Sequence, residues 1–192
     1  MRLLRAADRQ ATPWKNGGGV TREVAAWPPG SGFEDFDWRV SMAEVRTDGP
    51  FSAFPGVDRT LAVLEGRLRL TMEDGREVSL SPETAAVTFP GDAAVHAVVE
   101  DVPILDLNLM SRRGKVGARL TRLDVLLPQV VGPLAATALV IAASGSLRVV
   151  NSGAAYDLDL HDALLIEGRS EGLLIEAAMA SVAYVASFEA AL

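Results

Sequence analysis

Hydrophobic and polar residues alternate along most of the chain in short runs that end at turns. In the run 38–45, for example, Trp38, Val40 and Met42 share one face, and the intervening side chains fall on the other. Turns rich in glycine, proline and aspartate separate such runs at intervals of about 8–12 residues. This pattern predicts an all-β protein built as a sandwich or a barrel.

The predicted strands of the first half are short, with compact turns between them. They cover 2–4, 20–27, 38–45, 59–64, 67–72, 76–80, 85–89, 96–99 and 104–110. No segment shows a clear helical period, and 123–131 is the best candidate for a short helix.

The second half of the chain repeats the first faintly. Gly145 follows Gly66 at nearly the same spacing as Gly168 follows Gly91, and these glycines adjoin apolar runs. A nearly constant offset with small slips is expected of a duplicated β domain with insertions and deletions in its loops. The sequence therefore predicts an internal duplication.

Two domains follow from this duplication, at 1–115 and 116–192, with a basic, glycine-bearing linker at 111–117. After Leu120 the chain is dominated by alanine, valine, leucine and isoleucine, and its polar residues fall mostly in turns. We expect the ligand site in the first domain. The second is expected to pack against the first or against a second subunit, which makes a homodimer one of the predictions.

Composition narrows the function classes. The 192 residues carry a formal net charge of −7, which argues against nucleic acid as a main partner because phosphate binding favours a basic face. The absence of cysteine excludes disulfides, thiolate metal sites and a cysteine nucleophile. No apolar run approaches the roughly 20 residues of a membrane span, and the start of the chain lacks the apolar core of a signal peptide. We predict a cytoplasmic protein with no membrane partner.

One segment near the N-terminus combines three consecutive glycines with a large ring, a cation and an amide: Trp14, Lys15, Asn16, Gly17, Gly18 and Gly19. Glycines let a loop adopt unusual backbone angles or bring N–H groups close to a ligand. The segment could therefore grip a small anionic or planar molecule. The alternative is a tight turn in which Trp14 is a buried anchor.

Polar residues inside otherwise apolar strands give further candidates. Alternation in 104–110 puts Asp106 and Asn108 on one face and leucines on the other, so the polar face meets either solvent or a pocket. Arg59 opens one strand, and Arg39 lies within another.

These residues allow two interpretations. A pocket that contains Lys15, Arg59 or Arg39, His96 and Asn108 would bind a carboxylate together with a small polar group. Alternatively, Arg39, Glu44 and Asp106 form structural ion pairs in the wall of a barrel.

Several motifs, in order and spacing, resemble the HutD/Ves family: 13–23, 38–41, 49–52, 54–59 and 106–110. The resemblance is strong over residues 1–115 and vague beyond them. It implies a bicupin, with two tandem cupin-like β-barrels or jelly rolls, the second of them degenerate. It also implies an association with histidine utilisation in bacteria.

The same resemblance bears on metal binding. A typical cupin metal site uses several histidines, but the matching stretch 59–71 has none. The only histidines, His96 and His161, fall in different halves. We therefore expect no metal and no other cofactor. His96, which follows a degraded cupin motif at 90–92, is either a ligand contact in a former metal pocket or a hydrogen-bonded barrel histidine.

The favoured function is a small-molecule-binding bicupin that senses or regulates histidine breakdown by binding an acidic intermediate such as urocanate or formylglutamate. One alternative is an enzyme, a metal-independent hydrolase or isomerase acting on such an intermediate, with His96 as its best acid–base candidate. Another is a non-catalytic structural or interaction protein. The sequence leaves open whether a reaction is catalysed and favours binding.

Overall fold

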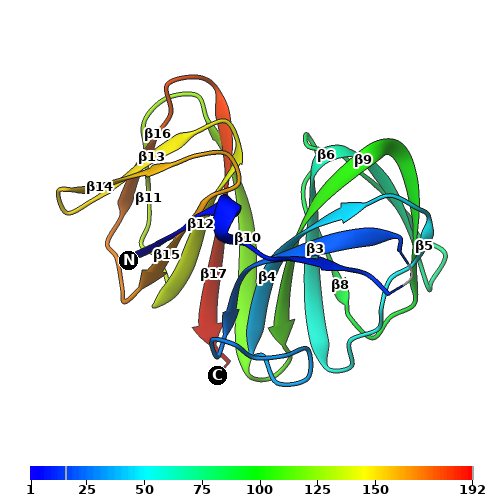
Figure 1. Cartoon of the computed structure of the whole chain (residues 1–192). Helices are drawn as coiled ribbons and strands as arrows, with labels where there is room; N and C mark the ends of the chain where they lie inside the picture. Colours follow the sequence, from blue (N-terminus) through cyan, green and yellow to red (C-terminus); the bar gives the residue numbers. More distant parts are fainter. Residues whose placement is uncertain (16, 192) are drawn as a thin grey trace. The chain divides into compact units, whose positions relative to one another are not determined.

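A computed structural model of the protein describes residues 1–15 and 17–191, and for Val102 the backbone only. The chain forms two compact units, one of residues 10–117 and the other of residues 1–9 with 118–191 (Figure 1). Both are built from β-strands, and the described residues add only a single 3-10 turn, η1 (Ala6–Asp8). The prediction of an all-β protein is confirmed.

The unit of residues 10–117 is a single eight-stranded sheet. Its strands are β2 (Ala11–Pro13), β3 (Gly19–Trp27), β4 (Trp38–Val45), β5 (Gly49–Pro50), β6 (Val57–Met72), β7 (Glu77–Leu80), β8 (Val87–Pro90) and β9 (Val95–Arg112). The main path runs β2-β3-β4-β9-β6-β7, while β5 pairs with β9 and β8 pairs with β6. All these pairings are antiparallel.

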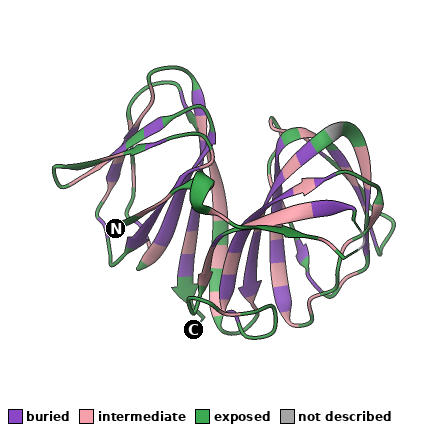
Figure 2. Ribbon diagram, in the orientation of Figure 1, coloured by how far each residue is buried: buried purple, intermediate pink, exposed green. Residues whose placement is uncertain are grey.

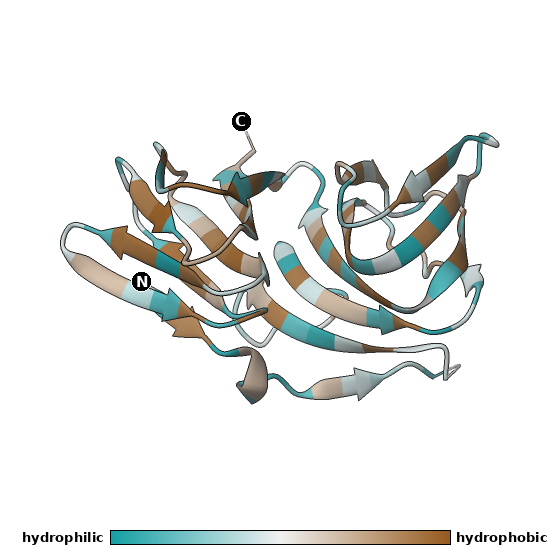
Figure 3. Ribbon diagram, turned by 90° about the horizontal axis from the view of Figure 1, so that it is seen from above, coloured by the Kyte–Doolittle hydropathy of each residue, from teal (hydrophilic) through white to brown (hydrophobic). Residues whose placement is uncertain are grey.

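This sheet curls around its own hydrophobic core (Figure 1). Val45 of β4, Leu61 of β6, Leu80 of β7 and Phe89 of β8 belong to one cluster of buried residues, although their strands are spread along the sheet. We call the face that carries this cluster the inner face. Hydropathy accordingly alternates in bands along the long strands (Figure 3).

A break in register divides the two long strands β6 and β9. The pairing shifts three times between Val63 and Leu68 of β6. Gly66 lies in this irregularity with a φ of 78°, and a Cβ there would meet the carbonyl oxygen of Pro103 at 2.8 Å. The glycine therefore allows each strand to continue through the irregularity, where the sequence pattern predicted separate strands.

The other unit contains two antiparallel sheets. The five-stranded sheet has the order β1 (Arg2–Leu4), β15 (Ala163–Glu167), β12 (Thr137–Ser144), β17 (Ser181–Ala190) and β10 (Val116–Val125). The four-stranded sheet has the order β11 (Gln129–Val131), β16 (Leu173–Glu176), β13 (Leu147–Asn151) and β14 (Ala154–Leu158). Both sheets contribute to one apolar cluster, and almost all of β12 is buried (Figure 2).

Two details differ from the sequence-based expectation. The N-terminal strand pairs with β15, so residues 1–9 belong with residues 118–191 and not with the first unit. The segment 123–131, the best candidate for a short helix in an otherwise all-β pattern, is not helical, because β10 continues to Val125 and β11 follows. Apolar periodicity over nine residues cannot separate a short helix from two strand ends joined by a turn.

Candidate functional site

Polar side chains interrupt the apolar inner face at its centre. Directly opposed residues of antiparallel strands share a face, and the register gives three successive rows across β6, β9 and β4. These are Arg59–Met110–Arg39, Leu61–Asn108–Ser41 and Val63–Asp106–Ala43. Because Leu61 and Val63 belong to the inner core cluster, all three rows lie on the inner face.

Arg59 is a buried cation surrounded by aromatic rings. It is 6% exposed, and its guanidinium carbon lies 4.8 Å from the ring centre of Phe51, 5.6 Å from Phe54 and 5.4 Å from Phe89. One nitrogen donates a hydrogen bond to the carbonyl oxygen of Ser52 at 3.4 Å, while Nε has no partner. Burial lowers the pKa of Arg59 to about 10, so the side chain stays charged at neutral pH.

Asp106 is the buried carboxyl group of the same face, at 3% exposure. Burial raises the pKa of its carboxyl to about 7, against the opposing effects of the Arg59 charge and a backbone hydrogen bond from Ala43. Its Oδ1 is buried without a hydrogen-bond partner. The carboxylate and the Arg59 guanidinium are not joined as an ion pair, and no other described carboxylate pairs with Arg59.

Asn108 lies between these two charges. Its row is the middle one of the three, and Ser41, opposite it on β4, is buried at 2% exposure. The Oδ1 atom of Asn108, like that of Asp106, is buried without a donor. Buried polar groups are nearly always hydrogen-bonded in native proteins, so several open partners on one face indicate a site that a ligand or ordered water completes.

Arg39 continues the row of Arg59 on the other side of β9. Its side chain is 11% exposed, forms an ion pair with Glu23 at 2.8 Å and lies over the ring of Phe33 at 4.6 Å. Phe33 contacts Phe54, with 5.8 Å between ring centres, and so links the surroundings of the two arginines. Arg39 therefore has a local partner, which Arg59 lacks.

Trp14, Lys15, Gly17 and Gly18 lie between β2 and β3, which pair antiparallel. The Trp14 N–H donates to the carbonyl oxygen of Gly19, and the indole Nε1 donates to Thr21 Oγ1 at 2.7 Å. A Cβ on Gly19 would lie 3.1 Å from the indole, so the glycine lets the ring lie against the backbone. Trp14 packs against the inner core cluster, and Thr21 lies in the row of Asp106. The buried-anchor interpretation of Trp14 fits these contacts.

The comparison with known proteins shows the family. Residues 6–184 match the HutD family. The chain is 34% identical over 177 residues to an uncharacterised 21.2 kDa protein of the hutC 3′ region of Pseudomonas putida, covering 92% of each chain. The chain belongs to the HutD family. It is also 36% identical over 112 residues to protein Ves of Citrobacter koseri, covering 58% of each.

Solved structures agree with this assignment. HutD from Pseudomonas fluorescens SBW25 is 31% identical with a TM-score of 0.81, and the match covers 98% of each chain. A cupin 2 conserved barrel domain protein from Leptotrichia buccalis shares the fold alone, at 9% identity, with a TM-score of 0.61 over 94% of this chain and 92% of that one. The predicted cupin-like, two-barrel fold is confirmed. The HutD match also extends well beyond residue 115, where the motifs were vague.

Some of the predicted site residues of this HutD chain lie on the inner face of the eight-stranded sheet, and others lie elsewhere. Arg39, Arg59 and Asn108 share adjacent rows, and Trp14 reaches the same core. Asn16 lies outside the described residues.

Four other predicted contacts lie apart from this group. Lys15 and Gly17 are exposed in the turn, and Gly18 is buried with its carbonyl oxygen accepting the N–H of Arg46. His96 is exposed on β9 between Val95 and Ala97, two members of the inner core, so its side chain points to the opposite face.

The alternative interpretation, in which Arg39, Glu44 and Asp106 form structural ion pairs, fits two of these three residues. Arg39 pairs with Glu23, and Glu44 pairs with Arg22 and Arg46, which lowers the pKa of Glu44. Asp106 does not fit that interpretation. It was recognised from alternation but was left out of the predicted site.

The aromatic residues around Arg59 were missed altogether. Phe51 and Phe54 precede β6 in a turn, and Phe89 lies opposite Arg59 on β8. The sequence signal was the clustering of phenylalanines with an arginine at 51–59, within two of the family motifs.

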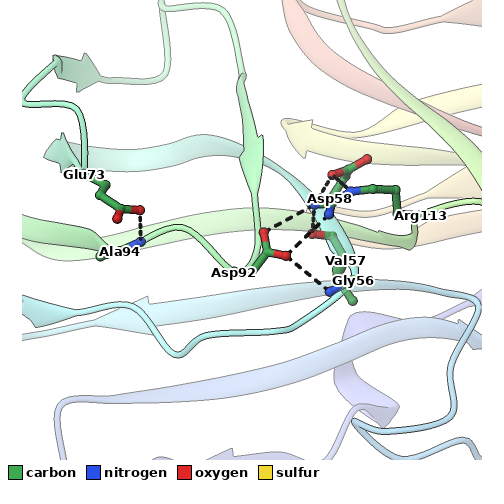
Figure 4. A network of polar contacts seen from close by, with 7 residues as sticks. All are labelled: Gly56, Val57, Asp58, Glu73, Asp92, Ala94 and Arg113. Atoms are coloured by element: carbon green, nitrogen blue, oxygen red, sulfur yellow. Dashed lines mark hydrogen bonds and ion pairs between the residues drawn. The ribbon is translucent and has the colours of Figure 1, made fainter.

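The degraded cupin motif at 90–92 has a structural role near the end of β8. Gly91 donates its N–H to the carbonyl oxygen of Val57, and its own carbonyl oxygen accepts the N–H of Phe54. The Asp92 carboxylate accepts from the Gly56 N–H and from Arg113 (Figure 4). Arg113 also pairs with Asp58 at 2.9 Å. These side chains are largely solvent-exposed, and the network joins the turn before β6 to the turn after β8.

The described residues contain no group of three or more histidine, cysteine, aspartate or glutamate side chains placed to hold a metal ion. No helix among them has the length and apolar character that a membrane crossing would require.

Proposed function

We propose that this HutD family member binds a small carboxylate on the inner face of the eight-stranded sheet, with Arg59 as the anchor for the anion. The observation that carries the proposal is a charged guanidinium, buried among three aromatic rings, that no described carboxylate neutralises. A buried, unpaired charge is strongly unfavourable, and an anionic ligand offsets it through charge-assisted, two-point hydrogen bonding.

The acid comes from histidine breakdown in this proposal, as a urocanate or formylglutamate type of intermediate, and the protein acts as a sensor or regulator. The family and the hutC-region relative support the pathway. The inner face supports binding more than catalysis, because His96, the expected acid–base residue, points away from it.

A thermal-shift panel tests the proposal. Urocanate, formylglutamate, formiminoglutamate and histidine are added at millimolar concentration, with and without a chelator. A ligand at 100 times its dissociation constant stabilises the folded state by about 2.7 kcal/mol, which gives a clear rise in melting temperature. A rise with one acid, unchanged by the chelator, supports the proposal, and no rise with any of them counts against it.

Asp106 favours one alternative, a metal-independent hydrolase or isomerase. A carboxyl with a pKa of about 7 in a buried site is suited to general acid–base catalysis near neutral pH. Incubating formylglutamate or formiminoglutamate with the protein and with Asp106→Asn, and following products by mass spectrometry, tests this function. Turnover that the substitution abolishes would establish an enzyme.

A homodimer remains a separate proposal. Four apolar side chains in the unit of residues 118–191 are strongly exposed, at 72% for Leu126, 77% for Leu127, 74% for Val130 and 79% for Met179. Exposed apolar side chains of this kind are found at interaction surfaces. Light scattering across a concentration series tests the dimer, and a monomer at all concentrations would rule it out.

A further inference from the structure

The inner face carries a second polar group at a distance from the proposed anion site. Arg59 faces Met110 on β9, whereas Asp106 lies four residues back along that strand, or about 14 Å at the rise of a β-strand. Arg59 and Asp106 therefore place polar groups at two separate positions along the same face.

In the three rows of the inner face, the buried atoms without a hydrogen-bond partner are a donor at Arg59 and acceptors at Asp106 and Asn108. At the Arg59 end a guanidinium nitrogen, a donor, has no partner. At the other end the Oδ1 atoms of Asp106 and Asn108, both acceptors, are buried and open. Since these two residues are next-but-one neighbours on one face of β9, a single donor group can lie between them.

We propose that Asp106 and Asn108 form a second subsite that accepts an N–H group, so that the ligand class is a carboxylic acid with an N–H donor at its other end. This inference rests on the proposed function, because Arg59 must hold the carboxylate. Asp106 sets specificity. A carboxylic acid of the same shape without the N–H leaves both buried acceptors unsatisfied, which makes its binding weaker.

Among the described residues, no group donates a hydrogen bond to Asp106 Oδ1. Its row across the sheet consists of Thr21, Ala43 and Val63, of which only Ala43 supplies a hydrogen bond, from its backbone. Thr21 accepts a hydrogen bond from the Trp14 indole through Oγ1 and does not donate to Asp106 Oδ1. The charge of Arg59 acts on Asp106, although the two side chains do not form an ion pair.

Matched pairs of acids test the inference by calorimetry on the intact protein. The first pair is urocanate and 3-(2-furyl)acrylate, which has the same acrylate arm and a five-membered ring without N–H. The second pair is N-formylglutamate and its N-methyl derivative. We expect the acid with the N–H in at least one pair to bind ten times more tightly than its partner. In Asp106→Ala, the ratio should fall to about one.

The variants keep the outcomes distinct. Asp101→Ala, an exposed change on the same strand, should preserve the ratio of the wild type. One outcome is that the wild type binds the acid with the N–H and its partner without the N–H equally tightly, and that an Arg59 variant loses binding of both. That result would overturn this inference and leave the proposed function standing. Binding of none of the four acids would overturn both. Circular dichroism melts of each variant show that it is folded.

Discussion

Arg59 and Asp106 lie on the same face of one curled sheet, each more than nine-tenths buried, and they do not form an ion pair. A folded protein seldom keeps a buried guanidinium and a buried carboxyl group apart, because each loses its hydration without gaining the other as a partner. The arrangement is reasonable for a binding site, in which the ligand supplies the missing partners. It also means that the two side chains favour ligand binding but lower the stability of the ligand-free protein.

Replacing Arg59 by methionine should therefore make the ligand-free protein more stable. Methionine keeps the apolar length of the side chain among Phe51, Phe54 and Phe89 and removes the buried charge. We expect the free energy of unfolding, measured with urea, to rise by about 1 kcal/mol, since the lost cation–π contacts offset part of the gain. A loss of several kcal/mol would show that the guanidinium has a structural role.

Asp106 should make the stability depend on pH. Its pKa is about 7 in the folded protein, against 3.8 without burial, so between these values the folded state holds a proton that the unfolded state has released. Stability from this group therefore falls as pH rises from about 4 to about 7, by up to about 1.4 kcal/mol per pH unit, and then levels off.

Asp106→Asn isolates this contribution, because asparagine has the same shape and does not titrate. The difference in unfolding free energy between the variant and the wild type should shift in favour of the variant as pH rises from 4 to 7. Urea titrations at four pH values measure it. A difference that stays constant over this range would mean that Asp106 has an ordinary pKa.

Gly66 should be needed for the irregularity that joins the two parts of β6. An alanine there would combine a φ of 78° with a contact of 2.8 Å to the carbonyl oxygen of Pro103, and we expect a loss of about 2–4 kcal/mol in chemical denaturation.

Gly75 in the β6–β7 hairpin is the matched control. Its φ is 82°, but nothing lies within 4 Å of an added Cβ, so Gly75→Ala should lose only about 1 kcal/mol. Equal losses at the two positions would show that backbone strain alone decides the effect.

The same irregularity in β6 and β9 explains for which site residues the alternation of hydrophobic and polar positions predicts the correct face of the sheet. Within 104–110 the period of two placed Asp106 and Asn108 correctly on one face. The inner residues of β6 are odd-numbered up to Val63 and even-numbered from Leu68, and those of β9 change parity likewise between Ala97 and Ile104. A sequence pattern shows neither how many residues a bulge absorbs nor which face follows it. His96, which was placed in one predicted pocket with Asn108 because it follows the degraded cupin motif, points to the opposite face.

Tertiary contacts account for the rest of what the sequence left open. Nothing local indicates that residues 2–4 pair with β15 some 160 positions later, or that Phe89 comes to lie beside Arg59. The turn glycines and the alternating runs are local signals, and the elements they indicate are present. The buried surroundings of Arg59 depend on how the sheet curls.

Lys15 and His96 provide a direct test of the inner-face site against the wider pocket expected from the sequence. Both side chains are exposed and outside the three rows. We expect Lys15→Ala and His96→Ala to change the affinity for the bound acid by less than twofold. A tenfold loss in either variant would move the site toward the glycine-rich turn or the opposite face of β9.

The most direct test of the account is isothermal titration of the acid found by thermal shift into three proteins: the wild type, Arg59→Met and Arg67→Gln. Arg67 is an exposed arginine on the same strand, 3.7 Å from Asp101. The account predicts that Arg59→Met reduces affinity at least a hundredfold while remaining folded, and that Arg67→Gln binds like the wild type. Undiminished binding by Arg59→Met would contradict the central claim that this buried cation holds the ligand.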